Sequence, residues 1–253
     1  MITTYHRPKT LDEALDLLTQ PNRTPLGGGT LLSKPTADSV EVVDLQALSL
    51  DSIKKNGNVL ELGATVTLQQ LLESELCPAA LQSALKLEAP LNLRNAATVA
   101  GTLVACDGRS TFASMLLAAD AKVEQANLED SKVEFQTSNV GEFLPLRSTK
   151  LITKIMFPLN IKLAFDYVAR TPSDKPIVCV GLAQWNSGRT RVALGGYGKN
   201  PLLAMDGTEA EGIETAARNA FHEAADEFGS AEYRMDVAAT LAKRCLDSLS
   251  ANS

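Results

Sequence analysis

The fold of this chain is decided by the stretch Leu91-Asn-Leu-Arg-Asn-Ala-Ala-Thr-Val-Ala-Gly-Thr-Leu-Val104, taken together with an earlier glycine cluster, Pro25-Leu-Gly-Gly-Gly-Thr30. Both combine threonine hydroxyls with small residues, which let a backbone approach a ligand closely. Successive N–H groups in such a loop can bind an anion, and a following helix start adds partial positive charge. Two such loops predict a dinucleotide that is held by the backbone rather than by basic side chains. We therefore expect Gly27–Thr30 and Thr98–Thr102 to face each other across one cleft, with their N–H groups aimed at one pyrophosphate.

Composition and charge restrict the class of protein. The 253 residues are 45% hydrophobic and 21% charged, which is ordinary for a globular protein. The net charge of −6 and the lack of a basic stripe argue against a nucleic-acid partner. Because the overall field does not attract anions, a phosphate ligand must be bound by local donors.

Cysteine and histidine content argues against a metal site or a catalytic residue in this chain. The cysteines are widely scattered, without a Cys-x-x-Cys, at Cys77, Cys106, Cys179 and Cys245. Two histidines are too few for a histidine metal cluster or a hydrolytic triad. Such a chain suits a cofactor that carries the chemistry. The N-terminus lacks the apolar core of a signal peptide, and no apolar run approaches the ~20 residues of a membrane span, so we expect a cytoplasmic protein without membrane insertion.

Local patterns predict alternating helices and strands up to about residue 158. Capping boxes at Thr10-Leu-Asp-Glu13 and Thr67-Leu-Gln-Gln70 start two helices, and Ser110 or Thr111 caps a third. Further expected elements are a helix over Pro78–Leu87 and a hairpin over Ile53–Gly63 with its turn at Asn56-Gly57-Asn58. The other strands are expected at Thr24–Leu26, Glu41–Leu45, Ala121–Gln125, Lys132–Gln136 and Leu151–Phe157. A loop is expected from Pro90 to Ala105.

The pattern changes after Pro158. Three successive strands are expected at Lys162–Arg170, Ile177–Gln184 and Thr190–Gly195, followed by helices at about Glu209–Phe228 and Ala231–Ser250. The turns between the strands favour an antiparallel meander. We therefore predict an α+β chain of two domains, with the boundary near Leu159.

The two glycine-containing motifs resemble those of a known family. Pro25-Leu-Gly-Gly-Gly-Thr30 is similar to the first flavin motif of the flavin-binding subunits of xanthine-dehydrogenase-type molybdenum hydroxylases, which include the carbon monoxide dehydrogenase medium chain. Leu93-Arg-Asn-Ala-Ala-Thr-Val-Ala-Gly-Thr102 is similar to the second motif. Arg191-Val-Ala-Leu-Gly-Gly196 and Ser230-Ala-Glu-Tyr-Arg234 resemble the C-terminal domain, so the resemblance covers nearly the whole chain in order.

The resemblance implies a fold, a cofactor and partners. The fold would be a vanillyl-alcohol-oxidase/PCMH-type FAD-binding domain over residues 1–158, followed by a small α+β C-terminal domain over residues 159–253 with a three-stranded antiparallel sheet and helices. The chain would bind FAD and pass electrons from iron–sulfur clusters through it to NAD or another acceptor. A molybdenum-cofactor subunit and a [2Fe-2S] subunit would complete the hetero-oligomer.

The resemblance also implies which residues hold FAD. They are Gly27, Gly28, Gly29, Thr30, Leu31, Thr98, Gly101, Thr102, Asp107 and Thr111. Several positions depart from the family pattern, because polar, acidic or glycine residues are replaced at Leu31, Ala100, Thr102 and Thr111, while Asp107-Gly108 stands for Ser-Pro and Arg109 is unexpected. Each lost neutral hydrogen bond costs about 0.5–1.5 kcal/mol, so FAD affinity is expected to fall without vanishing. Thr111→Asp, which restores the family's aspartate, is expected to tighten binding.

Two other functions stay open. A flavin-free structural subunit would keep the fold and the docking surface but have a degenerate FAD site, and it would purify without a yellow colour. An independent flavoenzyme similar to the enolpyruvyl-sugar reductases would share the FAD domain, although the C-terminal match at Gly195-Gly196 and Glu232-Tyr-Arg234 argues against it.

Overall fold

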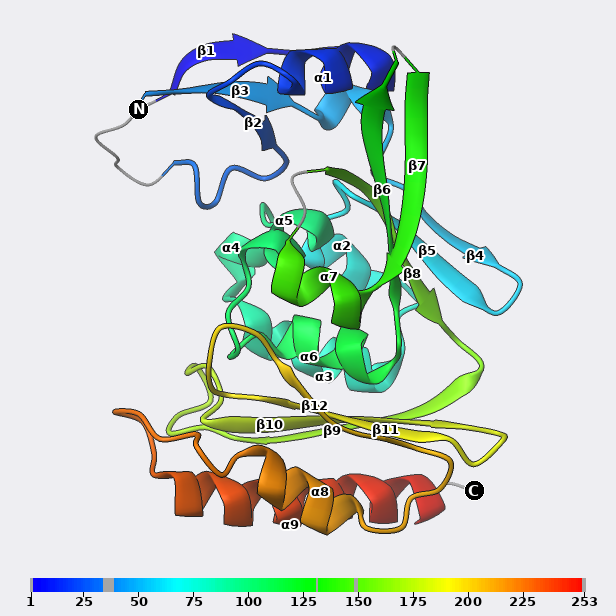
Figure 1. Ribbon diagram of the computed structural model, residues 1–253, viewed down its shortest axis with the longest axis vertical. Helices are drawn as coiled ribbons and strands as arrows, with labels where there is room; N and C mark the ends of the chain where they lie inside the picture. Colours follow the sequence, from blue (N-terminus) through cyan, green and yellow to red (C-terminus); the bar gives the residue numbers. More distant parts are fainter. Residues whose placement is uncertain (1, 34–38, 131, 148–149, 252–253) are drawn as a thin grey trace. The chain divides into compact units, whose positions relative to one another are not determined.

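The computed structural model describes residues 2–33, 39–130, 132–147 and 150–251, and the chain divides into two compact units (Figure 1). Unit 1 consists of residues 1–74, 91–104 and 122–156, and unit 2 of residues 75–90, 105–121 and 157–253. This division by contacts differs from two consecutive domains, because the helices within residues 75–90 and 105–121 pack with the C-terminal sheet. A division along the sequence near Leu159 stays a prediction.

Unit 1 begins with a parallel sheet of three strands in the order β1-β3-β2. These strands are β1 (Ile2–His6), β2 (Arg23–Leu26) and β3 (Val40–Asp44), and α1 (Leu11–Leu18) connects the first two. The helix starts at Thr10, whose side chain accepts a hydrogen bond from the Glu13 backbone. Strand β1 was not predicted, because most of its residues are exposed and no buried alternation marks it.

A five-stranded sheet in the order β4-β5-β8-β6-β7 follows. Its strands are β4 (Ile53–Asn56), β5 (Val59–Gly63), β6 (Lys122–Glu129), β7 (Lys132–Asn139) and β8 (Leu151–Pro158). The expected hairpin is confirmed, with Gly57 at φ 58° in its turn. The shorter elements of this part are η1 (Gln46–Leu48), α2 (Leu68–Glu73), α4 (Leu91–Arg94), α5 (Val99–Ala105) and α7 (Val140–Leu146). The loop expected between Pro90 and Ala105 is thus wrong: its alanines and leucines, which favour helix, form α4 and α5.

Unit 2 is built on an antiparallel sheet in the order β12-β11-β10-β9. Its strands are β9 (Ile161–Val168), β10 (Val178–Trp185), β11 (Thr190–Gly195) and β12 (Leu202–Gly207). The three expected strands are present, and β12 adds a fourth that the sequence patterns missed because none of its residues is buried. The helix expected over Glu209–Phe228 is shorter, since α8 (Ile213–Ala220) ends before a turn closed by the Asp226–Gly229 bridge.

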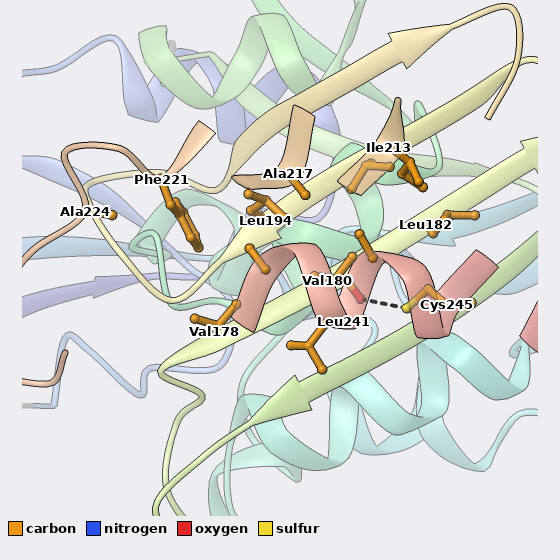
Figure 2. Close-up of a cluster of buried hydrophobic side chains, with 14 of the residues drawn as sticks. Val178, Val180, Leu182, Leu194, Ile213, Ala217, Phe221, Ala224, Leu241 and Cys245 are labelled. Carbon is orange, nitrogen blue, oxygen red and sulfur yellow. Dashed lines mark hydrogen bonds between the residues drawn. The ribbon is translucent and has the colours of Figure 1, made fainter. Parts of the chain in front are cut away.

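Helices cover both faces of this sheet. In Figure 1, α8 and α9 (Ala231–Ala251) lie on one face, and α3 (Ala79–Glu88) and α6 (Thr111–Ala118) lie on the other. Figure 2 shows the apolar core between the sheet and the first pair of helices, where strand residues such as Val180 and Leu194 meet Ala217 and Leu241. Within the described ranges, no helix is long and apolar enough to span a lipid bilayer.

Candidate functional site

The first glycine loop lies at the carboxyl edge of the small parallel sheet in unit 1. Strand β2 ends at Leu26 and the loop Gly27–Thr30 follows directly. Since β1, β3 and β2 run parallel, the residues after each strand meet at this same edge. Ligands of open parallel sheets bind outside the carboxyl ends of the strands. The topology therefore places the glycine loop where a bound ligand is expected.

An open pocket of about 290 Å³ lies at this edge. It is lined by Tyr5, Arg7, Leu26, Gly27, Gly28, Gly29, Asp44 and Gln46. Gly29 has a φ of 70°, a left-handed conformation that favours glycine. Among the described residues, none accepts a hydrogen bond from the backbone N–H groups of Gly28, Gly29 or Thr30. These groups can donate to an anion in the pocket.

The second motif has a different role. Thr98 caps helix α5, because its Oγ1 accepts a hydrogen bond from the Gly101 nitrogen at 3.1 Å. The Val99 nitrogen donates to Val66 O at 2.8 Å, and the Thr102 nitrogen donates to Thr98 O at 2.8 Å. The backbone N–H groups of residues 99–102 are therefore already engaged. These N–H groups are not available to a pyrophosphate, contrary to the expectation, and the Thr102 side chain is half-buried.

The two motifs touch each other directly rather than facing across a cleft. A Cβ on Gly28 would lie 1.7 Å from Ala96 O, and a Cβ on Gly27 would lie 2.8 Å from Thr98 Oγ1. Both glycines are thus required for packing against the second motif. Thr98 is 3% exposed, so it supports the loop from within the protein.

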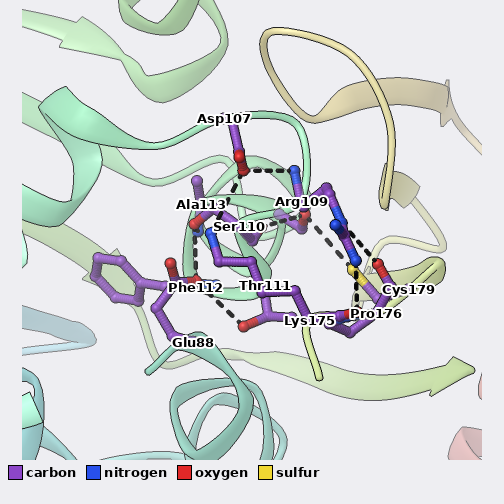
Figure 3. A network of polar contacts seen from close by, with 11 residues as sticks. Glu88, Asp107, Arg109, Ser110, Thr111, Phe112, Ala113, Lys175, Pro176 and Cys179 are labelled. Atoms are coloured by element: carbon purple, nitrogen blue, oxygen red, sulfur yellow. Dashed lines mark hydrogen bonds and ion pairs between the residues drawn. The ribbon is translucent and has the colours of Figure 1, made fainter. Parts of the chain in front are cut away.

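Two of the expected FAD contacts are engaged elsewhere (Figure 3). Thr111 is fully buried in unit 2, where its hydroxyl donates to Ala84 O at 2.7 Å and lies 3.2 Å from Glu88 Oε2. Glu88 also accepts from the Ser110 hydroxyl at 2.8 Å and the Phe112 nitrogen at 2.9 Å, so it neutralises the start of α6. Asp107 is exposed and pairs with Lys175. The sequence pattern identified the position of Thr111 in the family motif, but could not show that its hydroxyl is used by α3.

The unexpected residues beside Asp107 have structural partners in unit 2. The Arg109 guanidinium donates to Lys175 O at 2.8 Å and stacks 4.1 Å from the ring centre of Phe228. Gly108 donates to Gly198 O, and a Cβ there would lie 1.9 Å from Tyr197 O. Since Gly108 occupies the proline position of the family motif, this close backbone approach explains the departure.

Sequence patterns missed the charged residues of the pocket. Asp44, at the end of β3, is 2% exposed and forms an ion pair with Arg7 Nε at 3.4 Å. The Tyr5 hydroxyl donates to Asp44 Oδ2, and this hydrogen bond to a carboxylate raises the pKa of Tyr5 above its ordinary value. Because the sequence patterns did not predict strand β1, they did not place Arg7, which follows that strand, at the pocket. Over the described residues, no group of three or more His, Cys, Asp or Glu residues is placed to hold a metal ion.

Comparisons with known proteins place the chain. Residues 1–160 match the sequence family described as "FAD binding domain in molybdopterin dehydrogenase". The uncharacterised protein YgfM of Escherichia coli K12 is 27% identical over 250 residues, which are 95% of this chain and 94% of YgfM. Xanthine dehydrogenase of Blastobotrys adeninivorans is 32% identical over 169 residues, which are 56% of this chain and 12% of that enzyme.

Solved structures agree on the fold. Carbon monoxide dehydrogenase from Oligotropha carboxidovorans superposes with a TM-score of 0.82 and 22% identity, covering 99% of this chain and 98% of that one. Quinoline 2-oxidoreductase from Pseudomonas putida 86 gives a TM-score of 0.78 and 21% identity, covering 98% and 97%. The expected fold class is confirmed by these superpositions.

Proposed function

Because the chain belongs to the family of FAD-binding domains in molybdopterin dehydrogenases, we propose that it is the flavin-binding electron-transfer subunit of a multi-subunit molybdenum hydroxylase. FAD is the cofactor of this family, and it supplies the chemistry of accepting and passing on electrons. The chain's own contribution is to bind and orient that cofactor. Residues 1–158 are the proposed FAD-binding domain and residues 159–253 the C-terminal domain.

The pocket at the carboxyl edge of β1, β3 and β2 is the observation that carries this proposal. Its loop offers N–H groups that are free of partners in the described protein, which suits an anionic pyrophosphate. A Cβ on Gly29 would be strained by the left-handed backbone and would crowd this approach. The residues present therefore fit the phosphate part of FAD.

The proposed FAD-binding residues fall into two roles. Gly29 and Thr30 would donate backbone N–H groups to the cofactor, and Leu31 and Thr102 are kept as proposed side-chain contacts. Gly27, Gly28, Thr98 and Gly101 hold the two motifs together. Thr111 is not retained as a FAD contact, because its hydroxyl is engaged with Ala84 and Glu88, and the exposed Asp107 has its partner in Lys175.

Partner chains complete the proposed function. The family name ties the FAD domain to molybdopterin dehydrogenases, so we propose a molybdenum-cofactor subunit as the source of electrons and a [2Fe-2S] subunit as the relay. NAD or another acceptor would receive the electrons, and the proposed location is the cytoplasm. Affinity purification of the chain from its native host is expected to recover both partners. A preparation that oxidises substrate at full rate with this chain alone would contradict the proposal.

Titration of the purified chain with FAD tests cofactor binding directly. Saturable quenching of flavin fluorescence is expected, with a dissociation constant in the range of about 0.1–10 µM because several family contacts are missing. If no saturable binding occurs at about 50 µM FAD, the flavin-free structural subunit replaces the electron-transfer subunit as the best function.

A further inference from the structure

We infer that Arg7 is an anion-binding residue of this pocket, held by Asp44 so that its guanidinium meets the pyrophosphate of a dinucleotide beside the Gly27–Thr30 loop. The inference rests on the proposed function and deepens it. It also revises the expectation that the ligand is held by backbone groups alone. Nothing in the two glycine motifs points to Arg7, which reaches the pocket only because β1 pairs with β3.

The ion pair engages one side of the guanidinium. Arg7 Nε lies 3.4 Å from Asp44 Oδ2, and this ion pair keeps the guanidinium beside the carboxylate at the pocket wall. Elsewhere in the described protein, no residue accepts a hydrogen bond from the two terminal amino groups of Arg7. An arginine that pairs with a carboxylate through Nε keeps two parallel N–H donors on its terminal amino groups, which is the bidentate geometry that phosphate recognition uses.

Asp44 is built into the protein as a support. Its Oδ1 accepts a hydrogen bond from the Gln46 nitrogen at 3.0 Å, and its Oδ2 accepts from the Tyr5 hydroxyl. A carboxylate this well satisfied and 3% exposed stays in place when a ligand enters. Asp44 is therefore a positioning residue, and Tyr5 positions Asp44 in turn.

The charge arrangement favours an anion in spite of the carboxylate. The Arg7 side chain is 61% exposed and the Asp44 side chain only 3%, so an entering anion meets the guanidinium first. The overall charge of the protein, −6, gives no attraction of its own. The local positive charge of Arg7 would therefore supply the attraction for an anion that the net charge of the protein does not.

The pocket should discriminate ligands by their pyrophosphate. Two phosphates can be shared between two sets of donors, the loop N–H groups and Arg7. FAD and ADP carry a pyrophosphate, whereas riboflavin carries none. Arg7 should then contribute to binding of FAD and ADP and contribute nothing to binding of riboflavin.

Binding measurements on the full chain test the inference. Arg7→Gln is expected to weaken FAD and ADP binding about 10- to 100-fold, to leave riboflavin binding unchanged, and to reduce the salt dependence of FAD binding. Arg7→Lys keeps the positive charge but loses the bidentate guanidinium, so its affinity for FAD and ADP should lie between those of the parent and Arg7→Gln. Asp44→Asn should show a similar intermediate affinity. Arg218→Gln is the matched control, since Arg218 is another half-exposed arginine paired with a carboxylate but does not line the pocket.

The outcomes separate the inference from the proposed function. If the parent binds FAD and Arg7→Gln binds it equally well, the inference fails while the function stands. If Arg7→Gln loses FAD and riboflavin to the same extent, or its thermal midpoint falls well below that of Arg218→Gln, Arg7 is structural and the inference fails again. If the parent binds neither FAD nor ADP, the proposed function fails. Selective loss of the pyrophosphate ligands by a folded variant supports the inference.

Discussion

Gly28 and Ala96, on the two flavin motifs, are packed so closely that a Cβ on Gly28 would lie 1.7 Å from the Ala96 carbonyl oxygen. Real Cβ atoms do not approach an oxygen to this distance, so the neighbouring backbone would have to move. The first requirement for glycine at this position is therefore the packing of the two motifs against each other, independent of any ligand. A ligand-binding defect at this position would follow from a displaced loop.

Gly28→Ala is accordingly expected to lower the free energy of unfolding by about 2–4 kcal/mol, measured by urea denaturation. Gly57→Ala is the control. That glycine has open space around it and a φ of 58°, so only backbone strain of about 1 kcal/mol is expected. Equal losses in the two variants would show that the contact with Ala96 relaxes without cost.

Thr111→Asp is expected to destabilise the protein rather than to tighten FAD binding. The new carboxylate would be buried within reach of Glu88 Oε2, which lies 3.2 Å from the Thr111 hydroxyl. Two buried carboxylates cannot both ionise without repulsion, so a loss of about 2–4 kcal/mol is expected at pH 7. Glu88→Gln in the same chain should restore part of that loss. A Thr111→Asp variant that is as stable as the parent and binds FAD more tightly would return Thr111 to the FAD site.

Thr98→Ala is expected to cost about 1 kcal/mol of stability, because Oγ1 of Thr98 caps α5 through the Gly101 nitrogen. FAD affinity should fall as well, since the same side chain packs against Gly27. Thr98→Ser keeps the capping oxygen and should retain most of both properties. Thermal unfolding and FAD titration of the three proteins give the comparison. If Thr98→Ser is as impaired as Thr98→Ala, the methyl group rather than the hydroxyl is what matters.

Asp206 is expected to make the protein sensitive to acid. Hydrogen bonds from Arg189, with the charge of Arg191, hold the pKa of Asp206 below its ordinary value. A depressed folded-state pKa stabilises the protein above the unfolded-state pKa near 4, and that contribution is lost as pH falls through the folded-state value. Urea denaturation between pH 7 and pH 3 should show this loss in the parent.

Asp206→Asn should reduce the loss of stability between pH 7 and pH 3 and lower the free energy of unfolding by about 1–2 kcal/mol at pH 7. The pair with Arg191 contributes because Arg191 is 5% exposed, but solvent partly screens Asp206. Asp236→Asn provides the comparison. Its carboxylate pairs with Arg218 at the surface, where the side chain is 63% exposed, so little change is expected. An equal loss of stability at acid pH in the parent and in Asp206→Asn would assign the pH dependence to other groups.

Sequence alone determined the elements whose signals are local. The Thr67 capping box and the turn at Gly57 are both confirmed, because a cap or a tight turn depends on residues three or four positions apart. The two glycine motifs likewise stood out by composition and led to the FAD-binding family that residues 1–160 match. The fold class followed from that resemblance.

Only the tertiary structure decided which donors are free and which are engaged. Strand β1 carries little pattern of its own and forms by pairing with β3, which joins Tyr5 to Asp44 across 39 positions and brings Arg7 to the pocket. Glu88 takes up the hydroxyl of Thr111 from a separate helix, and Val66 accepts the N–H of Val99. Hydrogen-bond capacity is used up by long-range partners that a linear motif does not record. The sequence motifs indicated FAD as the ligand, and the tertiary packing determined which hydrogen-bond donors remain available to bind it.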